Sequence, residues 1–265
     1  MSGAPLKVFY DGFLGNPRLD HPEGVSVHPR DGSVWCGGEQ GQLYRIAPDG
    51  SSAEIVADTD GFLLGVTVSP SGDCVYAADI AHRAVFRYDI AAGALSTFAE
   101  GFRNPNSIAC SGEWVYISDS YPPGVPGPSV YRFDTNGNGG VFVAEPSSFA
   151  NGLALHGEWL YIAESFLPGV SRVHLSTLER ELVVRLPGTV PDGLAFGPDG
   201  LLYIACYEPS QILRVGAGGA VEVVAHDPTA HDLCHPTNIA FAGTTIIAAN
   251  LGRWHLTLVP TNGIV

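Results

Sequence analysis

Asp192-Gly-Leu-Ala-Phe196 is one of six related pentapeptides whose spacing decides the fold of this chain. Each has a variable first residue, followed by a small, an apolar, a small and an apolar residue. The other five are Glu23-Gly-Val-Ser-Val27, Leu64-Gly-Val-Thr-Val68, Asn106-Ser-Ile-Ala-Cys110, Asn151-Gly-Leu-Ala-Leu155 and Thr237-Asn-Ile-Ala-Phe241. Successive pentapeptides begin 41 to 45 residues apart. A repeat of this length is typical of proteins built from stacked or radially arranged units.

Further apolar runs follow each pentapeptide and indicate four β-strands per repeat. After Asn151 the runs are Leu160-Tyr-Ile162, Val170-Ser-Arg-Val173 and Leu182-Val-Val184. The runs are short, rich in β-branched and aromatic residues, and separated by Gly, Pro, Asp and Asn. No segment shows a sustained helical period. The pattern therefore predicts an all-β fold, a six-bladed β-propeller with four antiparallel strands per blade, in which residues 1–265 form one domain.

The two ends of the chain complement each other. The sixth repeat stops after its third run, Leu256-Thr-Leu-Val259, and so lacks an outer strand. The chain begins with an unpaired strand-like run, Leu6-Lys-Val-Phe-Tyr10. We expect this N-terminal strand to complete the last blade, because closing the ring removes the exposed edges that an open sheet would carry.

Composition narrows the class of protein. The formal charge of −14 argues against binding to a nucleic-acid backbone and is compatible with a bound cation. No apolar run is long enough to span a membrane, and the first residues lack the basic and apolar segments of a signal peptide. The five cysteines, at positions 36, 74, 110, 206 and 234, have no paired spacing. We therefore expect reduced thiols in a cytoplasmic protein. The expected partner is a small-molecule substrate, and the sequence leaves the oligomeric state open.

The first residue of each pentapeptide predicts a metal site. In a propeller the first strand of each blade lines the central axis, so equivalent positions converge on one ring. Four of the six positions carry side-chain oxygens: Glu23, Asn106, Asn151 and Asp192. Two carboxylates and two amides suit Ca²⁺, with Mg²⁺, Mn²⁺ or Zn²⁺ as alternatives. The competing interpretation is that these side chains bond turn backbone.

The residues two positions before this ring predict the mouth of the channel. They are His21, Phe62, Asn104, Phe149, Val190 and His235. This rim is mostly apolar and predicts contacts with substrate. His235 and His21 are suited to bind substrate or to relay protons. Alternatively both histidines, each followed by Pro, are loop residues that bond backbone.

Five segments together resemble the SMP-30/gluconolactonase family, over essentially the whole chain. They are His21-Pro-Glu-Gly24, Asn151-Gly-Leu-Ala154, Pro191-Asp-Gly-Leu-Ala-Phe196, His235-Pro-Thr-Asn-Ile-Ala-Phe241 and Asn250-Leu-Gly-Arg-Trp-His255. The resemblance implies a six-bladed propeller with a divalent cation, often Ca²⁺, at the top of the channel. It matches the family's metal ligands to Glu23, Asn151 and Asp192, and matches Asn106 to an Asn that contacts metal or substrate.

The resemblance also implies an activity, the hydrolysis of lactones or related esters. Sugar-lactone members tend to carry Arg two residues before the equivalent of Asn106, whereas this chain has Asn104 there and Arg103 one position earlier. That departure argues against a sugar acid lactone as substrate. A weaker resemblance extends to strictosidine-synthase-like and phosphotriesterase-type propellers.

The expected chemistry is metal-dependent hydrolysis. Asp192 would act as general base toward water or attack the carbonyl itself, and the residues leave both routes open. With Asn106 and His235 it forms the candidate catalytic set. A lyase, isomerase or condensing enzyme on the same fold is the alternative, and a non-catalytic binding propeller is a further one.

A second calcium motif lies within the third repeat. Asp134-Thr-Asn-Gly-Asn-Gly139, with Glu145 at the twelfth position, fits the spacing of an EF-hand loop. Its flanks have the pattern of strands, and Asn and Gly also suit a hairpin turn. The sequence therefore favours a hairpin here over a second calcium site.

Overall fold

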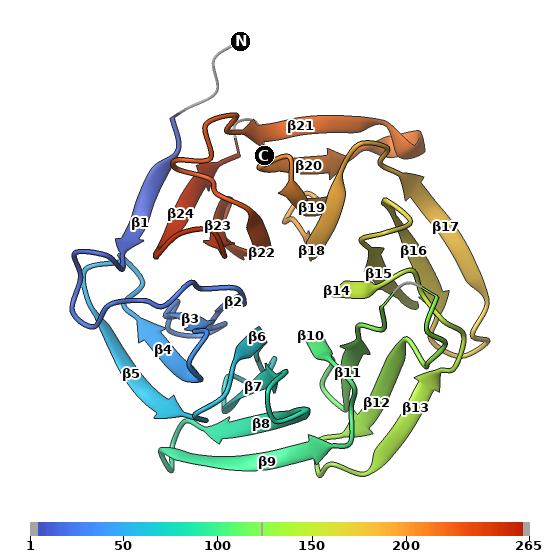
Figure 1. The fold of residues 1–265 in the computed structure, drawn as a ribbon, viewed down its shortest axis with the longest axis horizontal. Coiled ribbons are helices and arrows are strands. Elements are labelled where there is room, and N and C mark those ends of the chain that lie inside the picture. The colour runs from blue at the N-terminus through green and yellow to red at the C-terminus, as the bar shows by residue number, and fades with distance from the viewer. Residues whose placement is uncertain (1–4, 123, 262–265) are drawn as a thin grey trace.

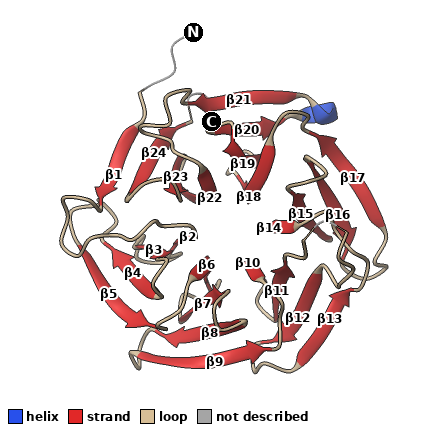
Figure 2. Cartoon of the chain, viewed as in Figure 1, coloured by secondary structure: helices blue, strands red, loops and turns tan. Residues whose placement is uncertain are grey.

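A computed structural model describes residues 5–122 and 124–261 of the chain. They form six four-stranded antiparallel sheets arranged around a central axis (Figure 1). The only helical element in these residues is one 3₁₀ turn, η1 (Ala217–Gly219), and strands account for nearly all regular structure (Figure 2). The predicted six-bladed β-propeller is thus confirmed. The first residues, Met1–Ala4, on which the expectation about a signal peptide rests, lie outside the described part.

Each blade runs outward from an inner strand beside the axis. Blade 1 contains β2 (Val25–Val27), β3 (Val34–Gly37), β4 (Gln42–Ile46) and β5 (Ala53–Asp58), and blade 2 contains β6 (Leu63–Val68), β7 (Cys74–Asp79), β8 (Ala84–Asp89) and β9 (Ala94–Glu100). Blade 3 contains β10 (Pro105–Cys110), β11 (Trp114–Asp119), β12 (Val130–Asp134) and β13 (Gly139–Val143), and blade 4 contains β14 (Ala150–His156), β15 (Trp159–Glu164), β16 (Gly169–His174) and β17 (Arg180–Arg185). Blade 5 contains β18 (Val190–Phe196), β19 (Leu202–Glu208), β20 (Gln211–Val215) and β21 (Val221–His226).

The sixth blade uses both ends of the chain. It combines β22 (Pro236–Ala242), β23 (Thr245–Asn250) and β24 (His255–Pro260) with the N-terminal strand β1 (Lys7–Asp11). Strand β1 pairs antiparallel with β24, with Lys7 opposite Leu258 and Asp11 opposite His255. The expected ring closure is therefore present, and Tyr10 is buried in the junction.

The hydrophobic core lies between neighbouring blades. Six clusters of buried side chains each join one blade to the next, as where Tyr161 and Ala163 of blade 4 pack with Leu194 and Ile204 of blade 5. The middle strands are the most deeply buried, and every residue of β7 is inaccessible to solvent or nearly so. Burial of apolar faces on both sides of each sheet holds the ring together.

The inner strands enclose a channel. A cavity of about 360 Å³ is lined by segments of all six inner strands, from Val25–Val27 in blade 1 to residues 238–241 in blade 6. No charged residue lines it among the described residues. The polar ring predicted above therefore stands at one end of an uncharged channel.

The EF-hand-like segment is a hairpin. Strands β12 and β13 pair antiparallel on either side of it. The Asp134 carboxylate accepts hydrogen bonds from the backbone N–H groups of Asn136 and Asn138, both at 2.9 Å, and Gly137 adopts a positive φ of 86°. The residues of the motif thus stabilise a hairpin turn.

Two further findings concern cysteines and membranes. All five cysteines are free thiols. The described residues contain no helix with the length and apolar character needed to cross a membrane.

Candidate functional site

The pentapeptide pattern reflects how closely the inner strands approach. A Cβ on Gly24, Gly65, Gly152 or Gly193 would overlap the carbonyl oxygen of the ring position in the next blade. In blades 2 to 6 the pairing of the inner strand is irregular at the ring residue and the residue after it, for example between Ala150 and Leu153. Such bulges re-aim side chains, and here they coincide with the predicted ring.

The four predicted ligands share one unusual property. Glu23, Asn106, Asn151 and Asp192 are only 4% to 6% exposed. Each nevertheless has a buried side-chain oxygen without a hydrogen-bond partner: Glu23 Oε2, Asn106 Oδ1, Asn151 Oδ1 and Asp192 Oδ1. A buried polar atom left unpaired costs about 1–3 kcal/mol. Only seven such atoms occur in the described residues, so four of them falling on equivalent positions calls for a common explanation.

The two carboxylates lie close enough to perturb each other. Burial, and then the charge of Asp192, raise the pKa of Glu23 well above its usual value. Burial raises the pKa of Asp192 to about 8, although the side-chain amide of Asn151 acts in the opposite direction. Two buried carboxylates and two amide oxygens without partners fit a divalent cation, whose charge would balance theirs.

Neighbouring blades fix the orientation of the ring side chains. The Asn151 amide nitrogen donates to Ser165 Oγ at 3.2 Å, so its oxygen is the atom left free. Ser165 in turn donates to the carbonyl of Pro191, the residue before Asp192, at 2.8 Å. Thr237, the ring residue of blade 6, donates from its hydroxyl to the Glu23 carbonyl at 2.7 Å. Thr237 therefore supports a ligand, and the sequence reasoning overlooked Ser165.

A second repeated feature anchors the loops that form the mouth. The last residue of the second strand in four blades accepts a hydrogen bond from the backbone just before the ring residue. The pairs are Asp79 with Phe62 N (3.2 Å), Asp119 with Asn104 N (2.6 Å), Glu164 with Ser148 N (2.9 Å) and Asn250 with Cys234 N (2.9 Å). We did not anticipate these residues from the sequence. The recurrence of Asp, Asp, Glu and Asn at the ends of equivalent apolar runs was the available signal.

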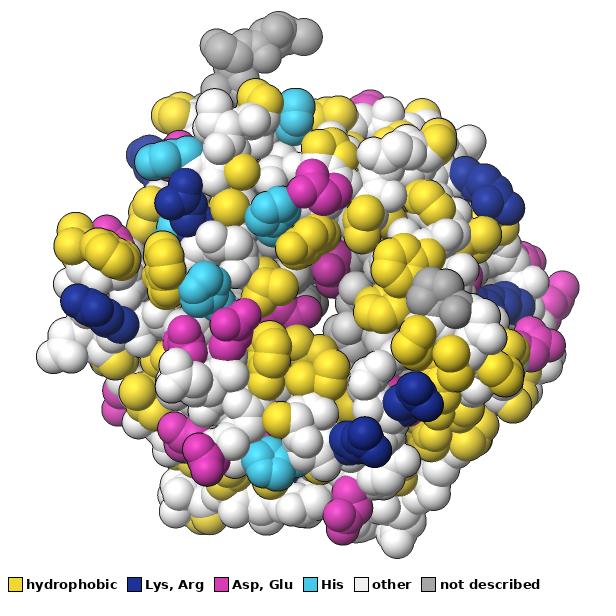
Figure 3. Space-filling view, in the orientation of Figure 1, with side chains coloured by type: hydrophobic (Ala, Val, Ile, Leu, Met, Phe, Trp, Pro, Cys, Tyr) yellow, Lys and Arg dark blue, Asp and Glu magenta, His cyan; other side chains and the backbone are white. Residues whose placement is uncertain are grey.

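The predicted rim residues are all partly exposed, in contrast to the buried ring. They are His21, Phe62, Asn104, Phe149, Val190 and His235. Figure 3 shows acidic side chains in and beside the central opening, with hydrophobic and histidine side chains around them.

The rim backbone is constrained in three of these loops. His21, Phe149 and His235 adopt positive φ angles of 44°, 65° and 48°, which L-residues seldom occupy. The Phe149 ring packs against Phe166 with centroids 5.0 Å apart. Asn104 donates from its side-chain amide to the Ser120 carbonyl at 2.7 Å, which leaves its side-chain oxygen for other partners.

Both rim histidines are held by backbone through one ring nitrogen. His21 Nδ1 lies 2.8 Å from the Leu251 carbonyl, and His235 Nδ1 lies 3.1 Å from the Tyr207 carbonyl. Because a carbonyl can only accept, each Nδ1 carries the proton and Nε2 of the neutral ring is an acceptor. The expectation that these histidines bond backbone is thus met at Nδ1 of each ring, whereas Nε2 stays available for a substrate or a proton.

His235 belongs to a small constellation that sequence analysis did not find. Its ring stacks on Tyr207 with centroids 4.5 Å apart, and Glu208 Oε1 lies 3.2 Å from its Nδ1. Burial raises the pKa of Tyr207, and the charges of Glu208 and Asp192 add to that effect. Tyr207 therefore contacts His235 and lies within reach of the charge of Asp192.

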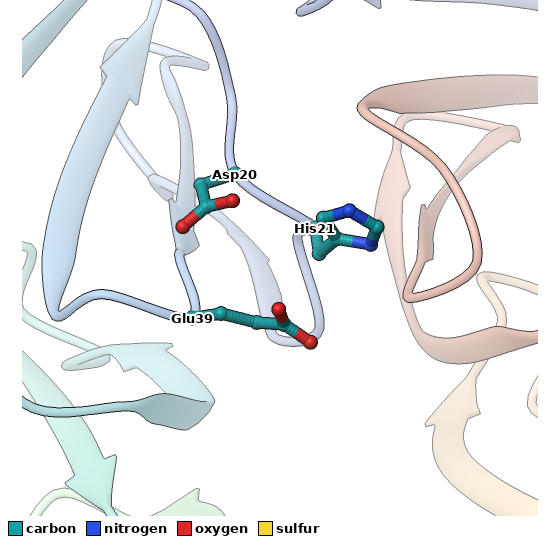
Figure 4. A group of neighbouring side chains, drawn as sticks. All are labelled: Asp20, His21 and Glu39. Carbon is teal, nitrogen blue, oxygen red and sulfur yellow. The ribbon is translucent and has the colours of Figure 1, made fainter.

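A separate cluster of possible ligands lies at the mouth. Single donor atoms of Asp20, His21 and Glu39 are within 4.8 Å of one another. Asp20 and His21 come from the segment before β2, and Glu39 comes from the turn after β3 (Figure 4). The His21 imidazole extends toward blade 6 and away from the two carboxylates in that view, in keeping with its bond to Leu251. The three side chains are therefore a second group of possible metal ligands, separate from the ring.

No protein-family model and no curated protein matches this chain. Solved structures do resemble it. A gluconolactonase from Xanthomonas campestris is 17% identical with a TM-score of 0.77, over 96% of this chain and 89% of that one. Regucalcin from Agrobacterium tumefaciens, described as calcium-binding, is 16% identical with a TM-score of 0.73, over 91% and 90%. Virginiamycin B lyase from Staphylococcus aureus is 16% identical with a TM-score of 0.69, over 96% and 99%. These likenesses establish a shared fold across proteins of different activity.

Proposed function

We propose that this protein is a divalent-metal-dependent hydrolase of lactones or related esters, with Ca²⁺ as the expected cation. The observation that carries the proposal is the set of four buried oxygens without partners on Glu23, Asn106, Asn151 and Asp192. A protein that only needed these side chains for folding would pair them with backbone. The gluconolactonase and regucalcin structures of the same fold add support.

The four ring residues would hold the cation. When bound, it would supply a Lewis acid that draws electron density from the substrate carbonyl. Asp192 is the candidate base that takes a proton from the attacking water, a role that typically contributes about 10²–10⁴-fold to a rate. Water adds to the carbonyl carbon, the ester C–O bond breaks, and the departing oxygen takes up a proton. Direct attack by Asp192 remains the second route, with an acyl-enzyme formed on its carboxylate.

The mouth would orient the substrate. His235 presents Nε2 as an acceptor and stacks on Tyr207, so these two side chains would carry a proton to or from the reacting oxygen. The partly exposed side chains of Phe62, Phe149 and Val190 offer apolar contacts. A substrate with a hydrophobic body suits this rim better than a polyhydroxylated sugar acid.

A lyase is the second candidate. The pairing of His235 with Glu208 favours it, because a carboxylate beside an imidazole supports proton abstraction without water. The shared fold with virginiamycin B lyase is compatible with such chemistry.

The test combines metal analysis with a substrate screen. Purified protein is assayed with lactones, aryl esters and phosphotriesters, with chelator and with added Ca²⁺, Mg²⁺ or Mn²⁺. We expect one divalent cation per chain and lactone or ester hydrolysis that chelator abolishes and a divalent cation restores. Hydrolysis that persists in chelator would contradict the metal role. Ring opening of a substrate without uptake of ¹⁸O from labelled water would favour the lyase.

A further inference from the structure

Three carboxylates at the channel mouth are not used by the ring or by the loop anchors. They are Asp20, Glu39 and Glu208. Asp20 and Glu39 lie beside the rim residue His21, and Glu208 lies 3.2 Å from the rim residue His235 with its side chain 55% exposed. Asp20 also has a buried oxygen, Oδ2, without a hydrogen-bond partner.

No lysine or arginine pairs with these carboxylates in the described part of the chain. Glu164, which anchors a loop in blade 4, shows the contrast, since Arg180 lies 2.9 Å from it. The side chains that border the opening in Figure 3 are acidic, histidine, hydrophobic or uncharged, and Lys and Arg lie farther out. Arg103 is placed over the ring of Tyr121. Arg253 lies beside the Cys234 thiol, which the charge of Glu208 also reaches, but it forms no ion pair with Glu208.

The electrostatic balance of the mouth follows from these contacts. A dication in the ring would cancel the charges of Glu23 and Asp192, which leaves the three mouth carboxylates without an ion pair to a lysine or arginine of the described residues. Clefts with walls of low dielectric constant concentrate such a field and repel ligands of like charge. Aromatic faces are also present at the mouth, on Tyr207 and on the Phe149–Phe166 pair, and such faces attract cations.

We propose that this mouth admits lactones or esters that are uncharged or positively charged and discriminates against anionic ones. The inference rests on the proposed function and specifies its substrate class.

Three γ-lactones of equal size test the proposal. They differ in one substituent, which is a carboxylate, a carboxamide or an aminomethyl group, and kcat/KM is measured with saturating Ca²⁺ at low and high ionic strength. At about 0.01 M salt we expect the carboxylate compound to be at least about tenfold poorer than the carboxamide, with the amine equal to the carboxamide or better. At about 1 M salt the difference should shrink severalfold, because the screening length falls from about 30 Å to about 3 Å.

Charge-removing variants assign the effect to the mouth. In Glu39→Gln combined with Glu208→Gln, the ratio of kcat/KM for the carboxylate lactone to that for the carboxamide should rise about three- to tenfold at low salt. A ratio is used because Glu208 contacts His235 and its loss can change both rates together. Glu113→Gln removes the same charge from the β10–β11 turn at the opposite end of blade 3, and should leave the ratio unchanged.

The outcomes separate this proposal from the proposed function. An anionic lactone that reacts as well as the carboxamide at low salt, or a ratio that the double variant does not move, overturns the charge selection. If none of the three compounds is hydrolysed in any divalent cation, the lactonase proposal fails. Ligand-observed NMR on the Ca²⁺-loaded protein then measures binding of the same compounds, and tight binding of the carboxylate overturns the charge selection independently.

Discussion

Individual side chains at the end of the channel combine deep burial with unpaired oxygens. Glu23 and Asp192 are both nearly inaccessible, and both have raised pKa values in the absence of a compensating charge. The amide groups of Asn106 and Asn151 do not satisfy all the carboxylate oxygens of Glu23 and Asp192, since Glu23 Oε2 and Asp192 Oδ1 have no hydrogen-bond partner. Buried oxygens without partners lower the stability of the folded state, and a bound cation would remove that loss by supplying the missing partner.

The two ring carboxylates should respond differently to loss of charge. Asp192→Asn keeps an oxygen but removes a charge and the candidate base, so kcat should fall by at least about 10²-fold even at saturating Ca²⁺. Glu23→Gln should mainly weaken the cation, and added Ca²⁺ should restore most of its rate. Titrating kcat against Ca²⁺ for both variants makes the distinction. A normal kcat for Asp192→Asn at high Ca²⁺ would remove Asp192 from the chemistry.

The rim residue Phe149 reports on the nature of the substrate. Phe149→Ala removes an apolar contact worth about 1–3 kcal/mol, so KM for aliphatic or aromatic lactones should rise about 10- to 100-fold while KM for gluconolactone-like sugars changes little. Val141→Ala, an exposed apolar residue on the strand β13, is the control. The interpretation of the rim as apolar is wrong if sugar lactones are by far the best substrates and Phe149→Ala raises KM equally for sugar lactones and for apolar lactones.

Among the structural elements, the inner strands determine how closely the ring residues of neighbouring blades approach one another. Each of the four glycines that follow a ring residue is in near contact with the backbone of the next blade. The bulge at the same place in blades 2 to 6 turns the ring residue out of regular pairing. Strand geometry and ligand placement are therefore linked at one position of the repeat.

A methyl group tests this link. The Cβ of Gly193→Ala would meet the Thr237 carbonyl and the Asn238 Cα, neither of which is on a flexible side chain. We expect a loss of about 1–3 kcal/mol in the free energy of unfolding and weaker Ca²⁺ binding. In Gly140→Ala the added Cβ has no neighbour within 4 Å, so that variant should change stability by less than about 0.5 kcal/mol. Equal melting curves for the two variants would show that the strands can separate at little cost.

The whole ring depends on one strand from the other end of the chain. Deleting residues 1–12 removes β1 together with Tyr10, exposes the edge of β24 and uncovers the remaining side chains of the cluster to which Tyr10 belongs. We expect aggregation, measured by light scattering, and a lower melting temperature. Removing residues 1–4 leaves β1 intact and serves as the control. A soluble 1–12 deletion variant with an unchanged melting temperature would mean that the ring is stable when its sixth blade has only three strands.

The coupling of the ring to the fold gives a pH dependence. Burial raises the pKa of Asp192 to about 8 and that of Glu23 well above its usual value, so without metal the folded state holds protons that the unfolded chain releases near pH 4. Because the folded state then binds more protons, the stability of the metal-free protein should fall as pH rises from about 4 to about 8. Melting in chelator at several pH values measures this. Added Ca²⁺ should stabilise most near pH 8, and a chelated protein whose stability rises over that range would contradict it.

The local pattern of the chain was sufficient for the architecture, whereas the metal site assigned to the ring stays a prediction. Strand runs, turn residues and the 41- to 45-residue spacing predicted the blades and the closure by Leu6–Tyr10, because strand formation and packing follow from the alternation of neighbouring residues. The same alignment placed Glu23, Asn106, Asn151 and Asp192 at equivalent positions, and equivalent positions of a closed ring lie at the same height along its axis. It also led us to the six rim residues.

The surroundings of that ring depended on contacts between segments distant in the chain. Ser165 holds Asn151 and also reaches the residue before Asp192, and Glu208 meets His235 only because the loops of blades 5 and 6 come together. The charge at the mouth, where no lysine or arginine of the described residues forms an ion pair with Asp20, Glu39 or Glu208, has the same origin. Repeat patterns describe what the blades share, whereas loops differ from blade to blade and their side chains acquire partners only when the ring has closed.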